Sequence, residues 1–295
     1  MDCFKDQHEN ELDKLRKQML ELKSENEDLV RSLYKVNEKL RDSEKLKGHF
    51  ISNITNEIVN PFASVLALAK NIMKLKKEEI EKVHRMAELI YEEAFHLDFQ
   101  LKNIFAAALI EAGREEPIIS EVHINSLGDY LLNYFHSQLE KRNIRLSISY
   151  FNLEVPDSNI LFLSDRGKLE MIVKNLVSNS IKYSPDGSEI RLEFIFEKGK
   201  LSFEVSDHGK GIKSGNREVV FDRFKQLDEK INSINTGHGL GLSIVQAYTE
   251  LLGGKVSLND NFDGGIRVQV SIPECVGIED WDDLEDFLFD SKESF

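Results

Sequence analysis

Hydrophobic residues recur every three or four positions along the first part of the chain, with charged residues between them. Between about residues 11 and 47, two positions of a heptad repeat carry the apolar side chains. They are Leu12, Met19, Leu33 and Leu40 with Asn26 among them at one position, and Leu15, Leu22, Leu29 and Val36 at the other. This spacing forms one apolar seam on a helix, which a partner helix must cover. The pattern therefore predicts a parallel coiled-coil dimer whose register Asn26 fixes, and a lone amphipathic helix is the alternative.

The helical pattern continues into a predicted hairpin of two helices. Residues 43–75 form the first helix, and Pro61 inside it is expected to produce a kink because proline has no N–H group. The turn is expected at residues 74–77, and the second helix over residues 78–112, with Gly113 as its C-terminal cap. Two such hairpins from two chains would form a dimeric four-helix bundle.

The pattern changes to mixed α/β beyond a short polar linker at residues 114–117. Alternation of apolar and polar residues predicts strands at 144–150, 190–196 and 201–206. Helical spacing predicts helices at 124–141 and 165–183, and Asp165 is the expected N-cap of the second. The chain is thus divided into a coiled-coil signalling helix (1–43), a helical hairpin (44–114), an α/β domain (118–275) and an acidic tail (276–295).

The acidic tail carries hydrophobic residues at a spacing that suits a short amphipathic helix. They are Trp281, Leu284, Phe287, Leu288 and Phe289. A frayed acidic tail is the alternative.

Composition limits the classes of function. The chain has 295 residues, of which 41% are hydrophobic and 31% charged, which is typical of a globular, helix-rich protein. A net charge of −14 argues against broad binding to nucleic acid or to anionic lipid, because both require basic surface. No run approaches the ~20 apolar residues that span a bilayer. Cys3 and Cys275 fit reduced thiols, so we expect a cytoplasmic protein with no membrane segment in this chain.

Polar side chains on the second predicted helix of the α/β domain suit a bound nucleotide. Asn175 and Asn179 are four residues apart, so both project from one face of the helix. A carboxamide oxygen can bind a hard cation such as Mg²⁺. Lys182 on an adjacent face can meet phosphate charge. Alone this pattern is weak, since pairs of asparagines are common on helices.

Two glycine-rich segments follow. Asp207, directly after a strand, can accept a hydrogen bond from an amine such as that of adenine, and Gly209 and Gly211 let the backbone approach a ligand closely. Residues 237–245 form a glycine-rich loop that runs into an apolar helix, whose N–H groups favour phosphate. Between them, residues 221–224 place two phenylalanines around Asp222 and Arg223, and a polar segment of lid length follows.

The order of these segments resembles the N, G1, F and G2 boxes of the sensor histidine kinases of two-component systems. This family shares its catalytic domain with gyrase-, chaperone- and mismatch-repair-type ATPases. The resemblance implies an α/β sandwich that binds ATP under a flexible lid, with Mg²⁺ on Asn179. It implies a pocket formed by Asn175, Asn179, Lys182, Tyr183, Asp207, Gly209, Gly211, Ile212, Gly237, Gly239, Leu240, Gly241 and Leu242. Because Asn175 stands where the ATP-hydrolysing relatives have a glutamate base, transfer to a protein group fits better than fast hydrolysis.

Residues 49–62 resemble the phosphoacceptor box of the same family, with one departure. The position of the phosphorylated histidine holds Asn56, and an amide nitrogen is not a useful nucleophile toward phosphorus. Glu57 matches the residue that polarises the histidine, and Asn60 matches the residue that positions water for dephosphorylation of a response regulator. His49 lies seven residues earlier, about 10 Å along a helix, too far from Glu57 to replace the acceptor.

Three hypotheses follow from Asn56. The chain is a homodimeric kinase core whose acceptor histidine was replaced by asparagine, which blocks autophosphorylation and transfer to the receiver domain of a response regulator. Alternatively it is a natural homologue that cannot be phosphorylated and acts as a phosphatase or a dimer partner. In the third hypothesis it is a signalling scaffold whose nucleotide pocket only sets conformation.

Overall fold

The computed structural model describes residues 58–76, 79–155, 159–213, 215, 217, 219–221, 239–261 and 264–275, together with 19, 22–23, 25–34, 36–37 and 41 near the N-terminus. The chain divides into two compact units, residues 1–56 and 57–295. In the first unit, residues 25–34 are helical. The described side chains of the predicted seam are at least 61% exposed: Met19, Leu22, Leu29, Leu33 and Val36. A coiled-coil partner for them stays a prediction.

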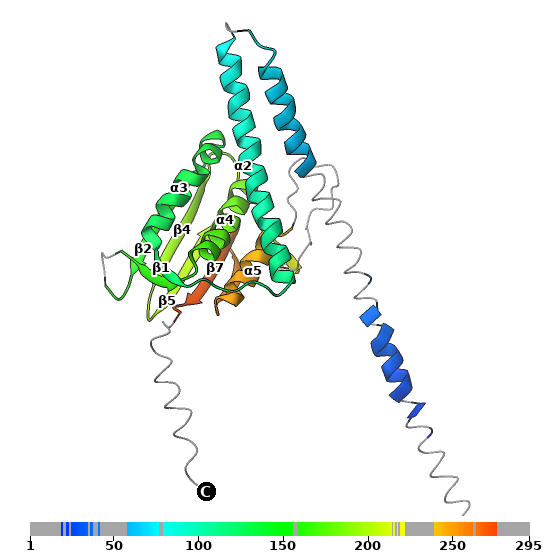
Figure 1. Cartoon of the computed structure of the whole chain (residues 1–295). Coiled ribbons are helices and arrows are strands. Elements are labelled where there is room, and N and C mark those ends of the chain that lie inside the picture. Colours follow the sequence, from blue (N-terminus) through cyan, green and yellow to red (C-terminus); the bar gives the residue numbers. More distant parts are fainter. Residues whose placement is uncertain are drawn as a thin grey trace, which may run out of the picture. The chain divides into compact units, whose positions relative to one another are not determined.

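A helical hairpin begins the second unit (Figure 1). Its first helix covers residues 58–72 and includes Pro61, and α2 covers Ile80–Glu111. The predicted turn is confirmed, with the Lys74 N–H bonded to the Asn71 carbonyl at 3.0 Å. Gly113 caps α2 as predicted. At φ +63° it lets its own N–H reach the Ile110 carbonyl and the next N–H reach the Leu109 carbonyl, both at 3.1 Å.

A five-stranded sheet forms the body of the α/β domain, in the order β2-β4-β5-β7-β6. The first two of these strands are parallel and the other neighbours are antiparallel. The strands are β2 (Arg145–Asn152), β4 (Glu189–Phe196), β5 (Lys200–Ser206), β7 (Ile266–Pro273) and β6 (Lys255–Asp260). Two short strands, β1 (Ser120–His123) and β3 (Leu161–Ser164), form a separate antiparallel pair. The three strands predicted from alternation are confirmed.

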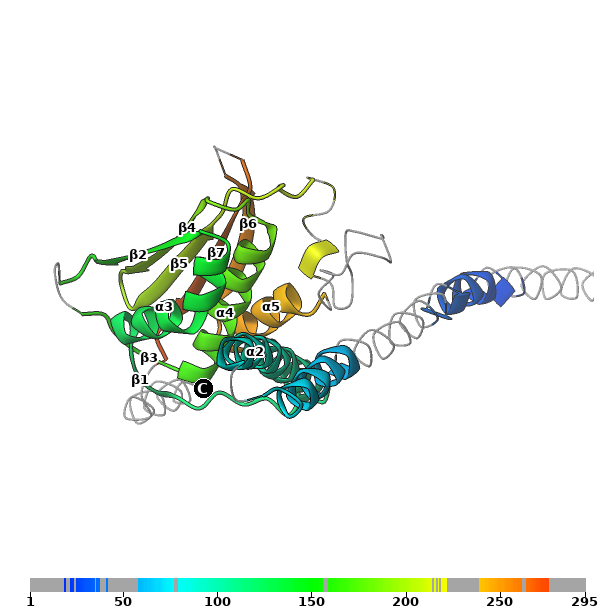
Figure 2. The same ribbon diagram turned by 90° about the horizontal axis from the view of Figure 1, so that it is seen from above.

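Three helices cover one face of this sheet, and α2 lies on the outer side of the helix layer (Figures 1 and 2). They are α3 (Ile124–Lys141), α4 (Arg166–Tyr183) and α5 (Gly241–Leu251). A short 3-10 helix, η2 (Val219–Phe221), precedes α5. The core between sheet and helices includes the fully buried side chains of Phe135, Phe162, Phe194 and Phe203. The helices predicted at 124–141 and 165–183 are confirmed.

Both ends of α4 are held by side chains, which fixes the helix that carries the candidate site. At its start, the Asp165 carboxylate accepts a hydrogen bond of 3.0 Å from the Lys168 N–H, as the predicted N-cap. At its end, the Arg142 guanidinium donates to the carbonyls of Ile181, Lys182 and Ser184. These carbonyls have no partner within the helix, so a cation there satisfies them.

Candidate nucleotide-binding site

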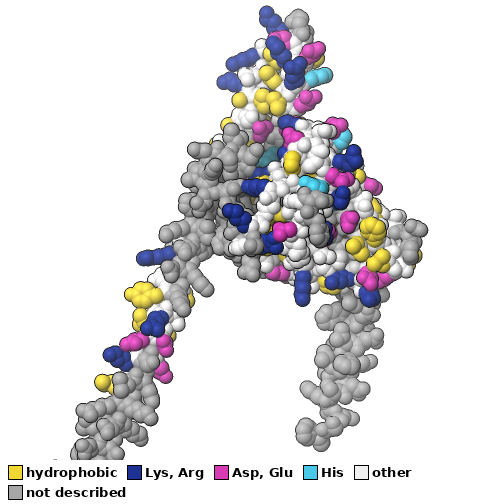
Figure 3. Space-filling model, turned by 180° about the vertical axis from the view of Figure 1, so that it is seen from behind, with side chains coloured by type: hydrophobic (Ala, Val, Ile, Leu, Met, Phe, Trp, Pro, Cys, Tyr) yellow, Lys and Arg dark blue, Asp and Glu magenta, His cyan; other side chains and the backbone are white. Residues whose placement is uncertain are grey.

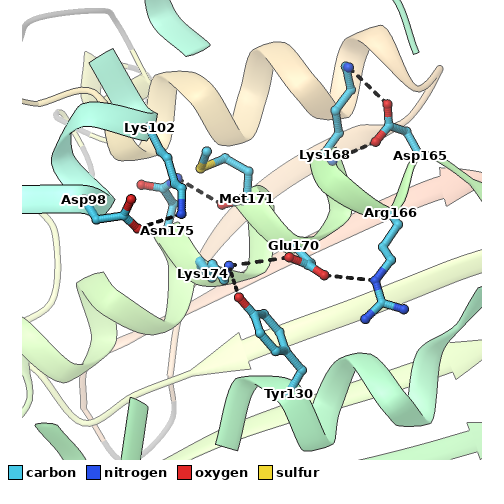
Figure 4. Close-up of polar contacts among 10 residues, drawn as sticks. All are labelled: Asp98, Lys102, Tyr130, Asp165, Arg166, Lys168, Glu170, Met171, Lys174 and Asn175. Carbon is cyan, nitrogen blue, oxygen red and sulfur yellow. Dashed lines mark hydrogen bonds and ion pairs between the residues drawn. The ribbon is translucent and has the colours of Figure 1, made fainter. Parts of the chain in front are cut away.

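Asn175 and Asn179 on α4 face the first residue of α5. Asn175 is 3% exposed, and its Nδ2 donates to the Met171 carbonyl at 2.9 Å (Figure 4) and to Oδ1 of Asn103 on α2 at 2.8 Å. A Cβ atom on Gly241 would lie 3.0 Å from Oδ1 of Asn175 and 3.4 Å from Nδ2 of Asn179. The start of α5 therefore approaches the two amides closely at a residue that has no Cβ, and a side chain there would crowd them.

Asp207 lies at the end of β5 with a carboxylate that is almost fully bonded. The residue is 2% exposed. Its Oδ2 accepts from the Ser180 hydroxyl at 3.0 Å, and its Oδ1 accepts from the N–H groups of Gly209 at 2.9 Å and Ile266 at 3.2 Å. A carboxylate offers about four acceptor positions. The donors in the described part of the chain thus leave one position, on Oδ2, for a further donor such as the amine of a purine base.

Backbone on two sides encloses this carboxylate. A Cβ on Gly265 would lie 2.2 Å from the Asp207 carbonyl oxygen, and a Cβ on Gly209 would lie 3.0 Å from the Tyr183 carbonyl oxygen. Asn261 donates its Nδ2 to the Asp207 carbonyl at 2.9 Å. Sequence reasoning missed Ser180, Asn261 and Gly265. The Gly264-Gly265 pair before a strand was the available signal for the last of them.

A cluster of positive charge surrounds Tyr183 at the end of α4. The Nζ atoms of Lys182 and Lys210 lie 5.3 Å and 5.2 Å from the centre of its ring, within the range of cation–π contacts. Tyr183 as a residue is 46% exposed. Two ammonium groups beside an exposed aromatic ring offer local attraction for an anionic ligand on a chain whose net charge is −14.

The remaining predicted site residues divide between described and undescribed parts of the chain. Gly211 and Gly239 have positive φ angles of +71° and +67°, which suit glycine. Ile212 and Leu242 are half-buried, and Leu240 is 1% exposed. Asn60 is exposed on the helix at residues 58–72. Asn56, Glu57, Gly237 and residues 222–236 lie outside the described residues, as do Cys3 and the tail from residue 276.

The linker after α2 is anchored by a buried ion-pair cluster. Lys168 Nζ lies 3.1 Å from Glu115 Oε2 and 3.0 Å from Asp165 Oδ2, and donates to the Glu116 carbonyl at 2.9 Å. Tyr248 on α5 donates its hydroxyl to Glu115 at 3.0 Å. Burial acts to raise the pKa of Asp165, but the N–H groups of Ile118 and Lys168 and the ammonium group outweigh it, so the pKa is lowered. These contacts hold the predicted linker in a defined conformation against α4 and α5.

Helix α2 packs on the α/β domain through one face. Its buried residues, Gln100, Asn103, Ala106 and Ala107, recur at helical spacing. Nearby, the rings of Phe95 and Tyr134 lie 4.5 Å apart, and Lys141 pairs with Glu92 at 2.8 Å. Burial raises the pKa of Tyr134. Beside it, Lys174 donates to the Tyr130 hydroxyl at 2.7 Å (Figure 4). Its ammonium group also lies over the rings of Tyr130 and Tyr134.

Comparison with known proteins identifies the type of the C-terminal domain. Residues 164–275 match the family described as "Histidine kinase-, DNA gyrase B-, and HSP90-like ATPase". A similar solved structure is that of full-length ShkA in complex with AMPPNP, at 22% identity and a TM-score of 0.55 over 79% of this chain and 46% of that one. Another is the Acinetobacter baumannii histidine kinase AdeS, at 16% identity and a TM-score of 0.52 over 75% and 98% of the two chains. The C-terminal region has the histidine-kinase ATPase fold.

Curated relatives are longer than this chain. The "Hybrid signal transduction histidine kinase D" of Dictyostelium discoideum is 28% identical over 259 residues, which are 86% of this chain and 16% of the relative. The "Sensor histidine kinase TmoS" of Ectopseudomonas mendocina is 29% identical over 237 residues, 80% of this chain and 24% of the relative. The chain therefore spans less than a quarter of the length of these two relatives. Among the described residues, no helix has the length and apolar character needed to cross a membrane.

Proposed function

We propose that the α/β domain binds ATP with its adenine at Asp207 and its phosphates at the start of α5. The observation that carries this proposal is the acceptor position on the Asp207 carboxylate that the three donors among the described residues leave open. The exocyclic amine of adenine supplies the fourth hydrogen bond. The N–H groups at the start of α5 (Gly241–Leu251) and the ammonium groups of Lys182 and Lys210 favour phosphate.

Magnesium fits this site as a companion of the nucleotide. The described residues contain no cluster of three or more His, Cys, Asp or Glu that could hold a metal ion by itself. Mg²⁺ in nucleotide sites takes few protein ligands and is otherwise held by phosphate and water. The neutral amides of Asn175 and Asn179, both close to Gly241, suit this role. When bound, the ion would neutralise phosphate charge, and Asn179 remains our proposed ligand.

The whole chain is proposed as the core of a sensor histidine kinase. In the family reaction, the γ-phosphoryl group passes to a histidine at position 56, with Glu57 as the polarising base, and then to an aspartate of a response regulator. Asn56 blocks the first of these transfers, because its amide nitrogen is not nucleophilic. We expect the binding of ATP to be independent of residue 56, since the described groups that hold Asp207 come from the α/β domain.

An autophosphorylation assay tests this assignment. The chain and its Asn56→His variant are incubated with labelled ATP and Mg²⁺. Only the variant should take up label, in an acid-labile and base-stable form typical of phosphohistidine. If both bind ATP and neither takes up label, the kinase assignment is wrong and a regulatory homologue replaces it. An Asp207→Ala variant that bound ATP as tightly as the unchanged chain would contradict the assignment of the pocket itself.

A homodimer is the assembly that the hairpin supports. Side chains on the first hairpin helix and its turn are more than half exposed although hydrophobic: Val59, Phe62, Leu66 and Met73. On α2, Phe105 is 64% exposed and Leu109 45%. Hydrophobic side chains also appear among the charged ones on the hairpin at the top of Figure 3. A second hairpin would cover such side chains in a four-helix bundle, which light scattering on the purified chain would detect as twice the monomer mass.

A phosphatase role is the second candidate, and the exposure of Asn60 favours it. A partner protein can reach this side chain, which matches the family residue that positions water against a phosphorylated receiver domain. The chain should then accelerate loss of phosphate from a receiver domain charged with acetyl phosphate. An Asn60→Ala variant should lose that acceleration while binding ATP normally. An equal rate in the two proteins would exclude the role of Asn60.

A further inference from the structure

The contact between Asn103 and Asn175 joins two elements that lie 72 positions apart in the chain. Asn103 is on α2 of the hairpin, and Asn175 is on α4 in the candidate ATP site. Both residues are 3% exposed. A buried polar side chain that loses its hydrogen-bond partner destabilises the fold, so loss of this contact would affect both the hairpin helix and α4.

The chemistry of the partners fixes which atom of each amide faces which way. The Met171 carbonyl can only accept a hydrogen bond, so the atom of Asn175 at 2.9 Å from it must be the NH₂ group. The same group points at Asn103, which must then present its oxygen at 2.8 Å. Both hydrogens of the Asn175 amide are used in this way. Its oxygen is left on the other side, 3.0 Å from where a Cβ of Gly241 would lie.

The orientation matters because Gly241 begins α5, where we place the phosphates. An amide oxygen that faces phosphate oxygens repels them unless a cation lies between, whereas an NH₂ group there could donate to phosphate directly. The direction of the Asn175 amide therefore decides whether the site favours nucleotide with a divalent cation or without one.

We propose that Asn103 is a positioning residue, through which the docked hairpin helix orients the Asn175 oxygen for Mg²⁺-bound nucleotide. This inference rests on the proposed binding of ATP. It assigns a role in the Mg²⁺ dependence of nucleotide binding to a residue of the hairpin, outside the ATP-binding domain. The docking of α2 that delivers Asn103 is supported by the ring contact of Phe95 with Tyr134 at 4.5 Å and by the ion pair of Lys141 with Glu92.

The test compares ATP affinity in Mg²⁺ and in EDTA for the full chain and for variants of α2. In Asn103→Leu, one of the two acceptors that hold the Asn175 amide is gone. The ratio of the dissociation constant in EDTA to that in Mg²⁺ should then fall about fivefold, the effect of one hydrogen bond of about 1 kcal/mol. Asn103→Asp keeps an acceptor oxygen in the same place, and its negative charge disfavours nucleotide without a cation, so its ratio should not fall.

Gln100→Leu is the matched control. Gln100 is 9% exposed on the same face of α2, but its side chain bonds to His96 of the same helix at 3.3 Å and not to α4. This variant should keep the ratio of the unchanged chain. Circular dichroism checks that each variant folds, and Asn103→Ala replaces Asn103→Leu if leucine prevents folding.

The outcomes separate this inference from the proposed function. An unchanged ratio in Asn103→Leu or Asn103→Ala overturns the positioning role while the ATP site stands. An equal fall in Gln100→Leu also overturns it, because general loosening of α2 would then explain the effect. If the unchanged chain binds no ATP in either buffer, the proposed function fails and this inference fails with it.

Discussion

Two adjacent glycines allow a direct test of the enclosed Asp207 carboxylate. Gly264 and Gly265 have nearly equal φ angles of +92° and +88°. A Cβ on Gly264 would meet nothing within 4 Å, whereas a Cβ on Gly265 would lie 2.2 Å from the carbonyl oxygen and 2.7 Å from Oδ1 of Asp207. Alanine at either position carries the same backbone strain, and only Gly265→Ala adds a collision.

The expected magnitudes follow from these two contributions. A non-glycine residue in the left-handed region costs about 1–2 kcal/mol. Overpacking of a close contact costs about 1–3 kcal/mol more. Gly264→Ala should therefore lower the free energy of unfolding by about 1–2 kcal/mol, and Gly265→Ala by about 2–5 kcal/mol. Because the collision involves backbone atoms of Asp207, rotation of a side chain cannot relieve it.

Urea unfolding and ATP titration of the two variants provide the measurement. Gly265→Ala should weaken ATP binding at least tenfold, about 1.4 kcal/mol, because Asp207 must shift away from its donors. Gly264→Ala should bind ATP like the unchanged chain. If the two variants lose the same free energy of unfolding and bind ATP equally, the close approach of residue 265 to Asp207 does not shape the site.

Three further changes address the start of α5 and the buried cluster at the linker. Gly241→Ala should weaken ATP binding in titrations, because its Cβ would crowd Asn175 at the proposed phosphate site. Its melting temperature should stay nearly unchanged, because the better helix propensity of alanine, about 1 kcal/mol, offsets this crowding. Lys168→Met should lower the free energy of urea unfolding by about 3–5 kcal/mol, since it leaves the buried Asp165 and the half-buried Glu115 without their cation. Lys102→Met at the exposed pair with Asp98 should change it by less than about 1 kcal/mol. The pKa of Asp165 is lowered in the folded protein, so this carboxylate stabilises the fold above its unfolded-state pKa of about 3.9. That stability is lost as the pH falls through the folded-state pKa. Asp165→Asn should therefore make the free energy of unfolding depend less on pH below about pH 4.

Much of the fold was predictable where a pattern is long and local. The helix predicted at 124–141 has those bounds in the structure, and Asp165 caps α4 as its position before an apolar period suggested. The strands β1 and β3 were missed because four residues are too few to show alternation. Strand β7, by contrast, alternates clearly in Ile266, Val268, Val270 and Ile272, three of which are buried, so its signal was present and unused.

In the candidate site, too, local motifs were predictable from the sequence and contacts between distant residues were not. The motif around Asp207 indicated a ligand site, because a carboxylate between a strand and two glycines is a local feature. Its hydrogen bonds to Ser180 and to the Ile266 N–H join positions 27 and 59 residues away, and no spacing in the sequence relates them. The linker at residues 114–117 looked merely polar, although Glu115 binds Lys168 and Tyr248. Long-range partners of this kind follow from the packing of helices on the sheet.

The described groups that hold Asp207 bear on the role that we propose for residue 56. The groups that hold Asp207 come from α4, from the residues after β5 and from the start of β7. Under the proposed function, a histidine at residue 56 would supply a nucleophile and would change none of these hydrogen bonds. Asn56→His should therefore gain autophosphorylation without a change in ATP affinity, measured by titration of both proteins. A several-fold change in affinity would contradict the proposed independence of ATP binding from residue 56.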